Sequence, residues 1–197
     1  AIVSHIYIEW IHPFGDGNGR TGRLTEFYIL LRGGNPDIAS HILSNYYNLT
    51  RTAYYRQIEK ATQKKDLSDF IEYALLGFRD GLVQTLDIIQ KSQFENTWKS
   101  LIFEKFDEMR SNITVTEGVF KRQRTLALEI PTGKFVALSD ITNVSIPLAK
   151  IYSNISQKTI QRDIEKLLEL QLVVKQNDKY IANTGVLHSM IAKRKIV

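Results

Sequence analysis

Residues 12–23 restrict the fold of this chain more than any other segment. They read His-Pro-Phe-Gly-Asp-Gly-Asn-Gly-Arg-Thr-Gly-Arg. A proline and three alternate glycines cannot lie in a helix interior without a large loss of stability. Residues 20–32 then place apolar side chains at helical spacing. The sequence therefore predicts a loop that runs directly into the N-terminus of a helix.

A loop that enters a helix is suited to anions, because free backbone N–H groups and the positive end of the helix dipole point out of it. The glycines at positions 15, 17 and 19 let a ligand approach the backbone closely. Arg20 and Arg23 can each donate bidentate hydrogen bonds to phosphate oxygens. These residues predict a phosphate-binding loop.

The remaining polar residues of the loop add chemistry to phosphate binding. Asp16 is a hard oxygen ligand of the kind that Mg²⁺ takes together with substrate phosphates. Histidine is the side-chain type most often used for proton transfer near neutral pH, so His12 is the natural general base. Asn18 can support either the loop or the phosphate. Together they indicate phosphoryl or nucleotidyl transfer from a nucleoside triphosphate.

Two other phosphate or metal loops do not fit. A calcium loop that started at Asp16 would need an acidic residue at its twelfth position, where the chain has Phe27. A Walker A loop would need Gly-Lys followed by Ser or Thr, and the chain has no such sequence.

The loop resembles the signature of the Fic family, His-x-Phe-x-(Asp/Glu)-Gly-Asn-Gly-Arg-x-x-Arg, at every specified position. Residues 1–11 resemble the family helix that ends at this loop. Residues 43–46 and 51–55 are similar to the Leu-Ser-x-Tyr and Arg-x-x-Tyr-Tyr segments that follow it. The resemblance covers roughly residues 1–110.

The resemblance implies a protein adenylyltransferase with ATP as co-substrate and Mg²⁺ as cofactor. His12 would take the proton from a Tyr, Ser or Thr hydroxyl of a target protein, and Asp16 would hold the metal. The residues expected at the nucleotide are Gly15, Gly17, Asn18, Gly19, Arg20, Arg23 and Tyr55. Simple helix packing is the alternative for Tyr54 and Tyr55, and Phe14 is expected to be buried as an anchor of the loop.

Two further readings stay open. A Fic enzyme could transfer another phosphate-containing group. A transcription regulator could instead sense nucleotide through this loop and bind DNA elsewhere. The family also has helices and a β-hairpin before the segment that begins here, so we expect the chain to be the C-terminal part of a longer protein.

Composition is ordinary for a soluble globular protein, with 197 residues, 43% hydrophobic and 24% charged. The absence of cysteine excludes disulfides and thiolate metal sites. No apolar run reaches the length of about 18 residues that a membrane helix needs, so we expect a cytoplasmic protein without membrane contact.

The chain is predicted to be mainly α, with a Fic-type helical domain over residues 1–111. Helices are expected within residues 38–62 and 66–111. The apolar stripe of the second segment, predicted to face the core, consists of Ile71, Leu75, Phe78, Leu82 and Leu86.

Residues 112–197 carry the basic excess, with 13 Lys and Arg against 7 Asp and Glu, a net charge of +6. Helices are predicted at residues 119–130 and 156–168, with one or two short helices over 138–152, broken around Pro147. Two strands flank a turn at residues 176–178. This order resembles a winged helix-turn-helix, a small α+β domain.

DNA is a candidate partner of this second domain. The residues expected to face the groove are Lys158, Thr159, Gln161, Arg162 and Asp163. Lys175 and Lys179 would meet phosphates. The alternative is a solvated face on a partner-binding module, or on one that forms a homodimer.

Overall fold

The computed structural model describes residues 1–112 and 116–187, and the chain divides into two compact units. The first unit is Ala1–Lys91 and the second is Ser92–Val197. Each has its own hydrophobic core. No helix within the described ranges combines the length and the apolar character that a membrane crossing requires.

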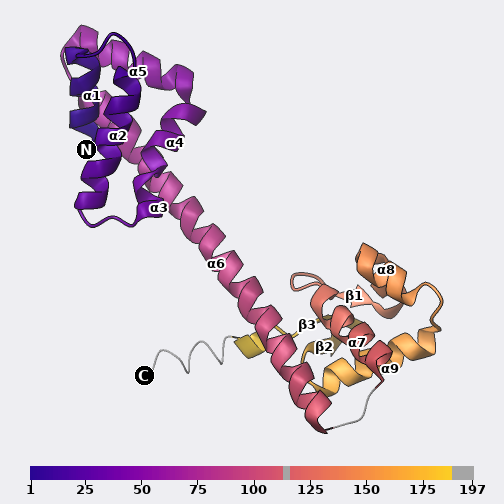
Figure 1. Ribbon diagram of the computed structural model, residues 1–197. Helices are drawn as coiled ribbons and strands as arrows, with labels where there is room; N and C mark the ends of the chain where they lie inside the picture. Colours follow the sequence, from indigo (N-terminus) through magenta and orange to yellow (C-terminus); the bar gives the residue numbers. More distant parts are fainter. Residues whose placement is uncertain (113–115, 188–197) are drawn as a thin grey trace. The chain divides into compact units, whose positions relative to one another are not determined.

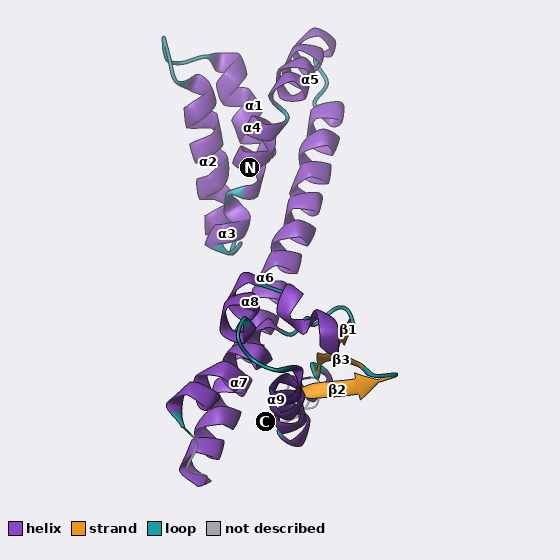
Figure 2. Ribbon diagram, turned by 90° about the vertical axis from the view of Figure 1, so that its right-hand side faces the viewer, coloured by secondary structure: helices purple, strands orange, loops and turns teal. Residues whose placement is uncertain are grey.

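The first unit is entirely helical in its described residues (Figures 1 and 2). Its elements are α1 (Ile2–Ile11), α2 (Asn18–Arg32), α3 (Asp37–Ser40), α4 (Ile42–Leu49), α5 (Arg51–Lys64) and the first part of α6 (Ser68–Asn112). Ile6 of α1, Leu43 and Tyr47 of α4, Tyr54 of α5 and Phe70 of α6 are buried together. The prediction of an all-α region is confirmed here.

The packed face of α6 in this unit differs from the predicted apolar stripe. Leu75 and Leu86 are 53% and 56% exposed. The face that packs carries Phe70, Ala74 and Gly77 instead. The ring of Tyr46 from α4 fills the space beside Gly77, so a small residue there admits a neighbouring helix. An apolar pattern cannot reveal such a position.

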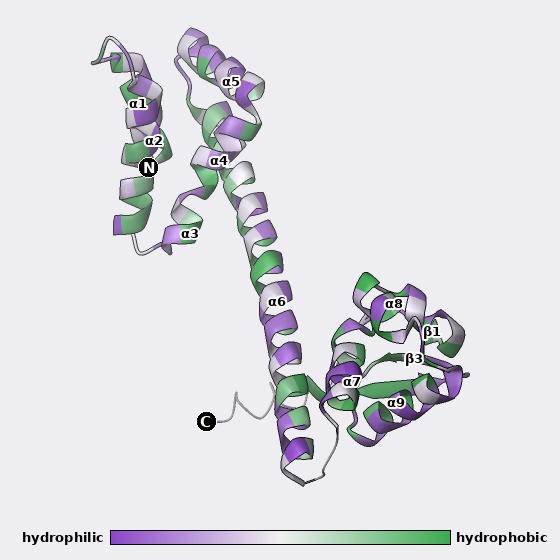
Figure 3. Cartoon of the chain, turned by 45° about the vertical axis from the view of Figure 1, so that its right-hand side comes forward, coloured by the Kyte–Doolittle hydropathy of each residue, from purple (hydrophilic) through white to green (hydrophobic). Residues whose placement is uncertain are grey.

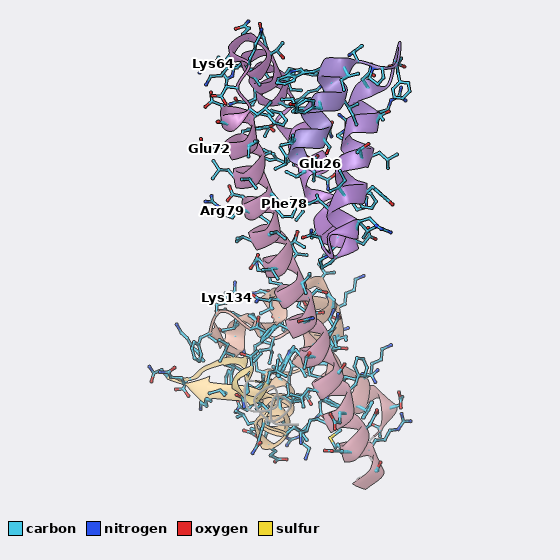
Figure 4. The ribbon with its side chains drawn as sticks, turned by 90° about the vertical axis from the view of Figure 1, so that its left-hand side faces the viewer. Glu26, Lys64, Glu72, Phe78, Arg79 and Lys134 are labelled. Atoms are coloured by element: carbon cyan, nitrogen blue, oxygen red, sulfur yellow. The ribbon has the colours of Figure 1, made fainter. Side chains whose placement is uncertain are left out.

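The exposed face of α6 is visible in Figure 4. Glu72 and Arg79 lie on the outer side of the helix, whereas Phe78 points towards the other helices of the first unit. Phe78 packs, partly buried, against the core of that unit, which agrees with its place in the predicted stripe.

The second unit combines helices with a small sheet. Its elements are the last part of α6, α7 (Glu117–Glu129), β1 (Val136–Ala137), a 3₁₀ helix (Leu138–Asn143), α8 (Ile146–Tyr152), α9 (Gln157–Glu169), β2 (Val173–Gln176) and β3 (Lys179–Ala182). The strands are antiparallel in the order β1-β3-β2. Figure 3 shows green, hydrophobic segments of the strands and of α9 within this unit.

The predicted hairpin is present, and one detail differs from the sequence prediction. The two-residue strand β1 was not expected, because a run this short has no recognisable alternation. The predicted break around Pro147 is confirmed, because the 3₁₀ helix ends at Asn143, α8 begins at Ile146, and Pro147 lies in the first turn of α8. A proline in the first turn leaves no helical hydrogen bond unmade. Ser145, whose side chain accepts from the Leu148 N–H at 3.4 Å, begins this helix.

The contact boundary between the units falls inside α6, ahead of the predicted boundary after residue 111. The reason is the packing of the last turns of α6. Trp98, Leu101, Ile102 and Phe106 are buried in the core of the second unit. One continuous helix, α6, therefore contributes residues to both hydrophobic cores. Its sequence has no helix-breaking residue where its packing passes from the first core to the second.

Asp163 does not face solvent, contrary to its predicted place at a DNA groove. It is 1% exposed. Its carboxylate accepts from Arg122 Nε at 2.6 Å, Arg122 Nη2 at 3.1 Å and Gln123 Nε2 at 2.9 Å. The Tyr152 hydroxyl donates to it at 3.0 Å. Burial and the charge of Asp163 raise the pKa of Tyr152, so this hydroxyl keeps its proton.

Replacing Asp163 is expected to destabilise the second unit selectively. Asp163→Ala removes the partner of a largely buried guanidinium and should lower the free energy of unfolding by about 3 kcal/mol. Urea titration monitored by Trp98 fluorescence, in a Trp10→Phe background, reports on this unit. The control is Glu165→Ala on the exposed face of α9, which should change stability by less than about 0.5 kcal/mol. Equal effects of the two variants would contradict the structural role of Asp163.

Candidate active site

The loop between α1 and α2 is fixed at both ends by left-handed backbone. His12 follows α1 with φ 50° and Gly17 precedes α2 with φ 90°. The Asn18 side chain, 3% exposed, spans the loop. Its Oδ1 accepts from the Phe14 N–H at 3.0 Å, and its Nδ2 donates to the Phe14 carbonyl at 2.6 Å. Asn18 therefore supports the loop, one of the two roles that the sequence left open.

His12 is exposed at the end of α1. Its Nδ1 lies 3.4 Å from the Glu9 carbonyl oxygen, one turn earlier. A carbonyl oxygen can only accept, so this contact favours the tautomer with the proton on Nδ1. Nε2 then carries the free lone pair, as a general base requires.

Asp16 and Arg20 form an ion pair across the loop, with 3.0 Å between Asp16 Oδ2 and Arg20 Nη2. The two side chains are 92% and 73% exposed. An exposed pair of this kind contributes at most about 1 kcal/mol. A ligand with its own charges can therefore replace the pair at little cost in stability.

A polar cavity of about 380 Å³ lies in the first unit. Its lining consists of Arg23, Ser44, Asn45, Tyr47, Asn48, Arg51, Tyr54 and Tyr55. Two of the predicted nucleotide residues, Arg23 and Tyr55, are thus brought together, whereas His12, Asp16 and Arg20 lie outside the lining. The sequence analysis did not assign a role to Arg51, whose Cζ lies 5.7 Å from the centroid of the Tyr55 ring. The position of Arg51 in the Arg-x-x-Tyr-Tyr segment was the sequence feature that could have identified it as a site residue.

The structure separates the two readings of Tyr54 and Tyr55. Tyr54 is 3% exposed and packs in the core, whereas Tyr55 is 56% exposed. The expectation that Phe14 is buried is wrong, because its ring is 49% exposed. The backbone of Phe14, held by Asn18, anchors the loop instead of the ring.

A buried polar network that the sequence analysis missed lies between the helices of the first unit. His5 of α1 is 0% exposed and Glu26 of α2 is 1% exposed. His5 Nδ1 lies 3.1 Å from Glu26 Oε2, and the Tyr47 hydroxyl donates to Glu26 Oε1 at 3.1 Å. His5 Nε2 lies 2.8 Å from the Tyr54 hydroxyl. Figure 4 shows Glu26 on its helix in this unit.

Burial of the two tyrosines fixes the direction of their hydrogen bonds. Burial, with the nearby Glu26 carboxylate, raises the pKa of Tyr47. Burial and Glu9 raise the pKa of Tyr54, against a smaller opposing effect of Arg23. Both hydroxyls remain protonated near neutral pH and donate to carboxylates. The network therefore joins α1, α2, α4 and α5 without an unpaired tyrosine.

Comparison with known proteins points to one family. A family model described as Fic/DOC family matches residues 1–30. Protein adenylyltransferase Fic of Nematostella vectensis is 37% identical over 73 residues, which is 37% of this chain and 16% of that protein. Protein adenylyltransferase fic-1 of Caenorhabditis elegans is 36% identical over 73 residues, 37% of this chain and 13% of that protein.

A longer match covers both units of the chain. A probable protein adenylyltransferase of Aquifex aeolicus (strain VF5) is 28% identical over 167 residues, 80% of this chain and 50% of that protein. No solved structure matches the chain.

A substitution at Gly22 tests the close contact beneath the loop. A methyl group there would lie 2.9 Å from His5 Cδ2, so Gly22→Ala should destabilise the first unit by about 1–2 kcal/mol despite its better helix propensity. Hydrogen exchange of the α1 and α2 amides should become faster. Gly15→Ala is the control, because nothing lies within 4 Å of its added methyl group. Unchanged amide exchange rates in Gly22→Ala would show that α1 and α2 leave room for a methyl group between Gly22 and His5.

The chain spans half or less of the length of each of these relatives. The family model covers the segment that carries the loop, and each of these relatives is named as a protein adenylyltransferase, one of them as a probable one. The family model makes residues 1–30 similar to the Fic/DOC family, and the longer chain is similar to these adenylyltransferases.

Proposed function

We propose that the chain carries the active part of a protein adenylyltransferase, which transfers AMP from ATP to a Tyr, Ser or Thr hydroxyl of a target protein. The observation that carries the proposal is the cavity that unites Arg23 of the loop motif with Arg51 and Tyr55. Two guanidinium groups beside an exposed aromatic ring suit a phosphorylated ligand with a planar base. The names of the relatives support the same activity.

In this proposal the nucleotide binds with its base near Tyr55 and its phosphates at the start of α2. Gly17 and Gly19 present backbone N–H groups there, and Arg20 and Arg23 bind the β- and γ-phosphates. The weak ion pair of Arg20 with Asp16 opens when the ligand arrives, because both groups gain stronger partners.

The donor set fits a magnesium ion held mainly by substrate phosphates. Within residues 1–112 and 116–187, no group of three or more His, Cys, Asp or Glu side chains gathers to form a complete protein cage. Mg²⁺ commonly takes only one or two carboxylates and completes its shell with phosphate and water. Asp16 is the carboxylate that would hold it, and the ion would neutralise charge on the triphosphate.

His12 then acts on the target. Its Nε2 takes the proton from the hydroxyl group, and the hydroxyl oxygen forms a bond to the α-phosphorus of ATP. The bond from that phosphorus to the bridging oxygen breaks, and pyrophosphate leaves. Positioning and electrostatic stabilisation supply most of the rate in reactions of this kind. A relative that transferred another phosphate-containing group would need the same base.

Replacing His12 is expected to abolish most of the transfer. With ATP labelled at the α-phosphate, His12→Ala should reduce protein labelling by about 10²–10⁴-fold, the usual contribution of a general base. The exposed His41→Ala is the control and should retain labelling. ATP labelled at the γ-phosphate should leave no label on protein. Label from the γ-position would indicate phosphorylation in place of adenylylation, and full activity of His12→Ala would remove His12 from its role.

We propose DNA binding as a second function, carried by a winged helix-turn-helix in the second unit. One observation favours it: the only acidic side chain in the first half of α9, Asp163, is buried against Arg122. Lys158 and Arg162 therefore form an exposed basic face, with Thr159 and Gln161 half-buried beside them. Gln161 is already engaged with Glu165 at 2.9 Å.

The hairpin supplies less positive charge than the sequence suggests. Lys175 pairs with Asp178 at 2.7 Å across the turn, which raises the pKa of Lys175. Lys179 is exposed. The contribution of the hairpin to phosphate binding therefore depends mainly on Lys179.

A mobility-shift series across salt concentrations tests this second function. If α9 enters a groove, log affinity should fall with log salt with a slope near −0.9 per phosphate contacted. Arg162→Ala should weaken binding, and it should relax sequence preference if Arg162 contacts a base edge. Arg79→Ala on α6 removes the same charge from the first unit and is the control. Absence of a shift at low salt would favour a protein-binding role for this face.

A further inference from the structure

The carboxylate of Glu9 lies where α1 meets the first turn of α2. A methyl group on Gly19 would lie 2.9 Å from Glu9 Oε1 and 3.3 Å from Arg23 Nη1. The carboxylate and the guanidinium thus converge on the same point of the backbone, at the end of the helix that faces the loop. Glu9 does not line the polar cavity, whereas Arg23 does.

Glu9 is held in place by the buried network. Its Oε1 accepts from the Tyr54 hydroxyl at 3.2 Å and lies 4.0 Å from His5 Nε2. Its side chain is only 17% exposed. The same Tyr54 hydroxyl lies 2.8 Å from His5 Nε2, so two side chains of the network hold it in place. The carboxylate therefore has a fixed position, unlike the exposed acids of the surface.

The fixed negative charge of Glu9 lies close to Arg23 without a hydrogen bond to it, and attracts that side chain through space. Arginine has many rotamers, and ordering it on a ligand costs conformational entropy. A guanidinium has five N–H donors, so one edge can face a carboxylate while the others remain free for phosphate oxygens. A carboxylate on one side thus restricts the side chain without using up its donors.

We infer that Glu9 is a positioning residue, which orients the Arg23 guanidinium towards the β- and γ-phosphates of the bound nucleotide. The inference rests on the proposed function, since it needs a triphosphate at the start of α2. Glu9 touches neither substrate in this arrangement. Glu9 acts on the nucleotide through Arg23 alone. Its loss should therefore change the affinity for ATP and leave the affinity for AMP unchanged.

Glu9→Gln is the informative variant, because an amide keeps the shape and the oxygen that accepts from Tyr54 but removes the charge. Calorimetry on the 197-residue chain with Mg²⁺ should show ATP binding weakened by about two- to fivefold, the range of a weak ion pair. AMP lacks the β- and γ-phosphates, so its binding should not change. Glu72→Gln is the control, with the same loss of charge at an exposed site of the first unit.

A double variant shows whether the effect passes through Arg23. Adding Glu9→Gln to Arg23→Ala should cause no further loss of ATP binding, because the group to be oriented is gone. Glu9→Asp, which keeps the charge, should restore part of the affinity lost in Glu9→Gln. A residue with only a structural role would weaken ATP and AMP alike and would lower the midpoint of thermal unfolding.

The outcomes distinguish this inference from the proposed function. Wild-type ATP affinity in Glu9→Gln would overturn the inference and leave the proposed function intact. Tighter ATP binding would also overturn it, because the carboxylate would then act by repelling the triphosphate. A wild-type chain that binds ATP no better than AMP would overturn the proposed function, and the role of Glu9 with it.

Discussion

The close approach of α1 and α2 at His5 and Gly22 is the contact on which the geometry of the loop depends. The His5 ring occupies the space that a side chain at position 22 would need, which brings the two helices together one turn above the loop. Glu26 then meets the same ring from α2 at 3.1 Å. Since the loop connects these two helices, its two ends are set by this contact.

Such a contact is stable only if its buried polar groups are all paired. A buried carboxylate without a partner costs several kcal/mol, whereas a fully bonded one is tolerated. Glu26 has His5 and Tyr47, and Tyr54 has His5 and Glu9. The second unit follows the same rule around Asp163, although nothing relates the two clusters in sequence. In each unit a buried carboxylate binds side chains from different elements and so selects one packing arrangement.

Local signals in the sequence were sufficient for the elements but not for how they pack. The loop, the helix after it, α9 and the β2–β3 hairpin were all predictable, because glycine, proline and apolar spacing act over a few residues. The packed face of α6 was not, because Gly77 contributes space and no apolar side chain. The partners of His5 and Asp163 were also not predictable, because they lie 21 and 41 positions away in the chain.

In the candidate site, too, the residues of the local motif were predictable from the sequence, whereas the residues brought in by packing were not. Its loop residues could be named from their order alone, since the motif lies within twelve consecutive positions. The cavity residues Ser44, Asn48 and Arg51 come from α4 and α5, and only the fold brings them to Arg23. Phe14 was expected to be buried as an anchor of the loop, yet Asn18 anchors the loop through the Phe14 backbone, and Phe14 is 49% exposed.

The arrangement also explains how a loop rich in glycine can hold one defined geometry. Glycines lower the cost of unusual backbone but increase the entropy lost on folding. Here the entropy is offset by restraints at few points: the helix end at His12, the two hydrogen bonds of Asn18, and the contact beneath Gly22. Asp16 and Arg20, the groups proposed to meet the ligand, lie exposed outside these restraints and are paired with one another. A rigid frame with weakly paired charges at its rim can exchange those charges for phosphate and metal without rearranging the helices.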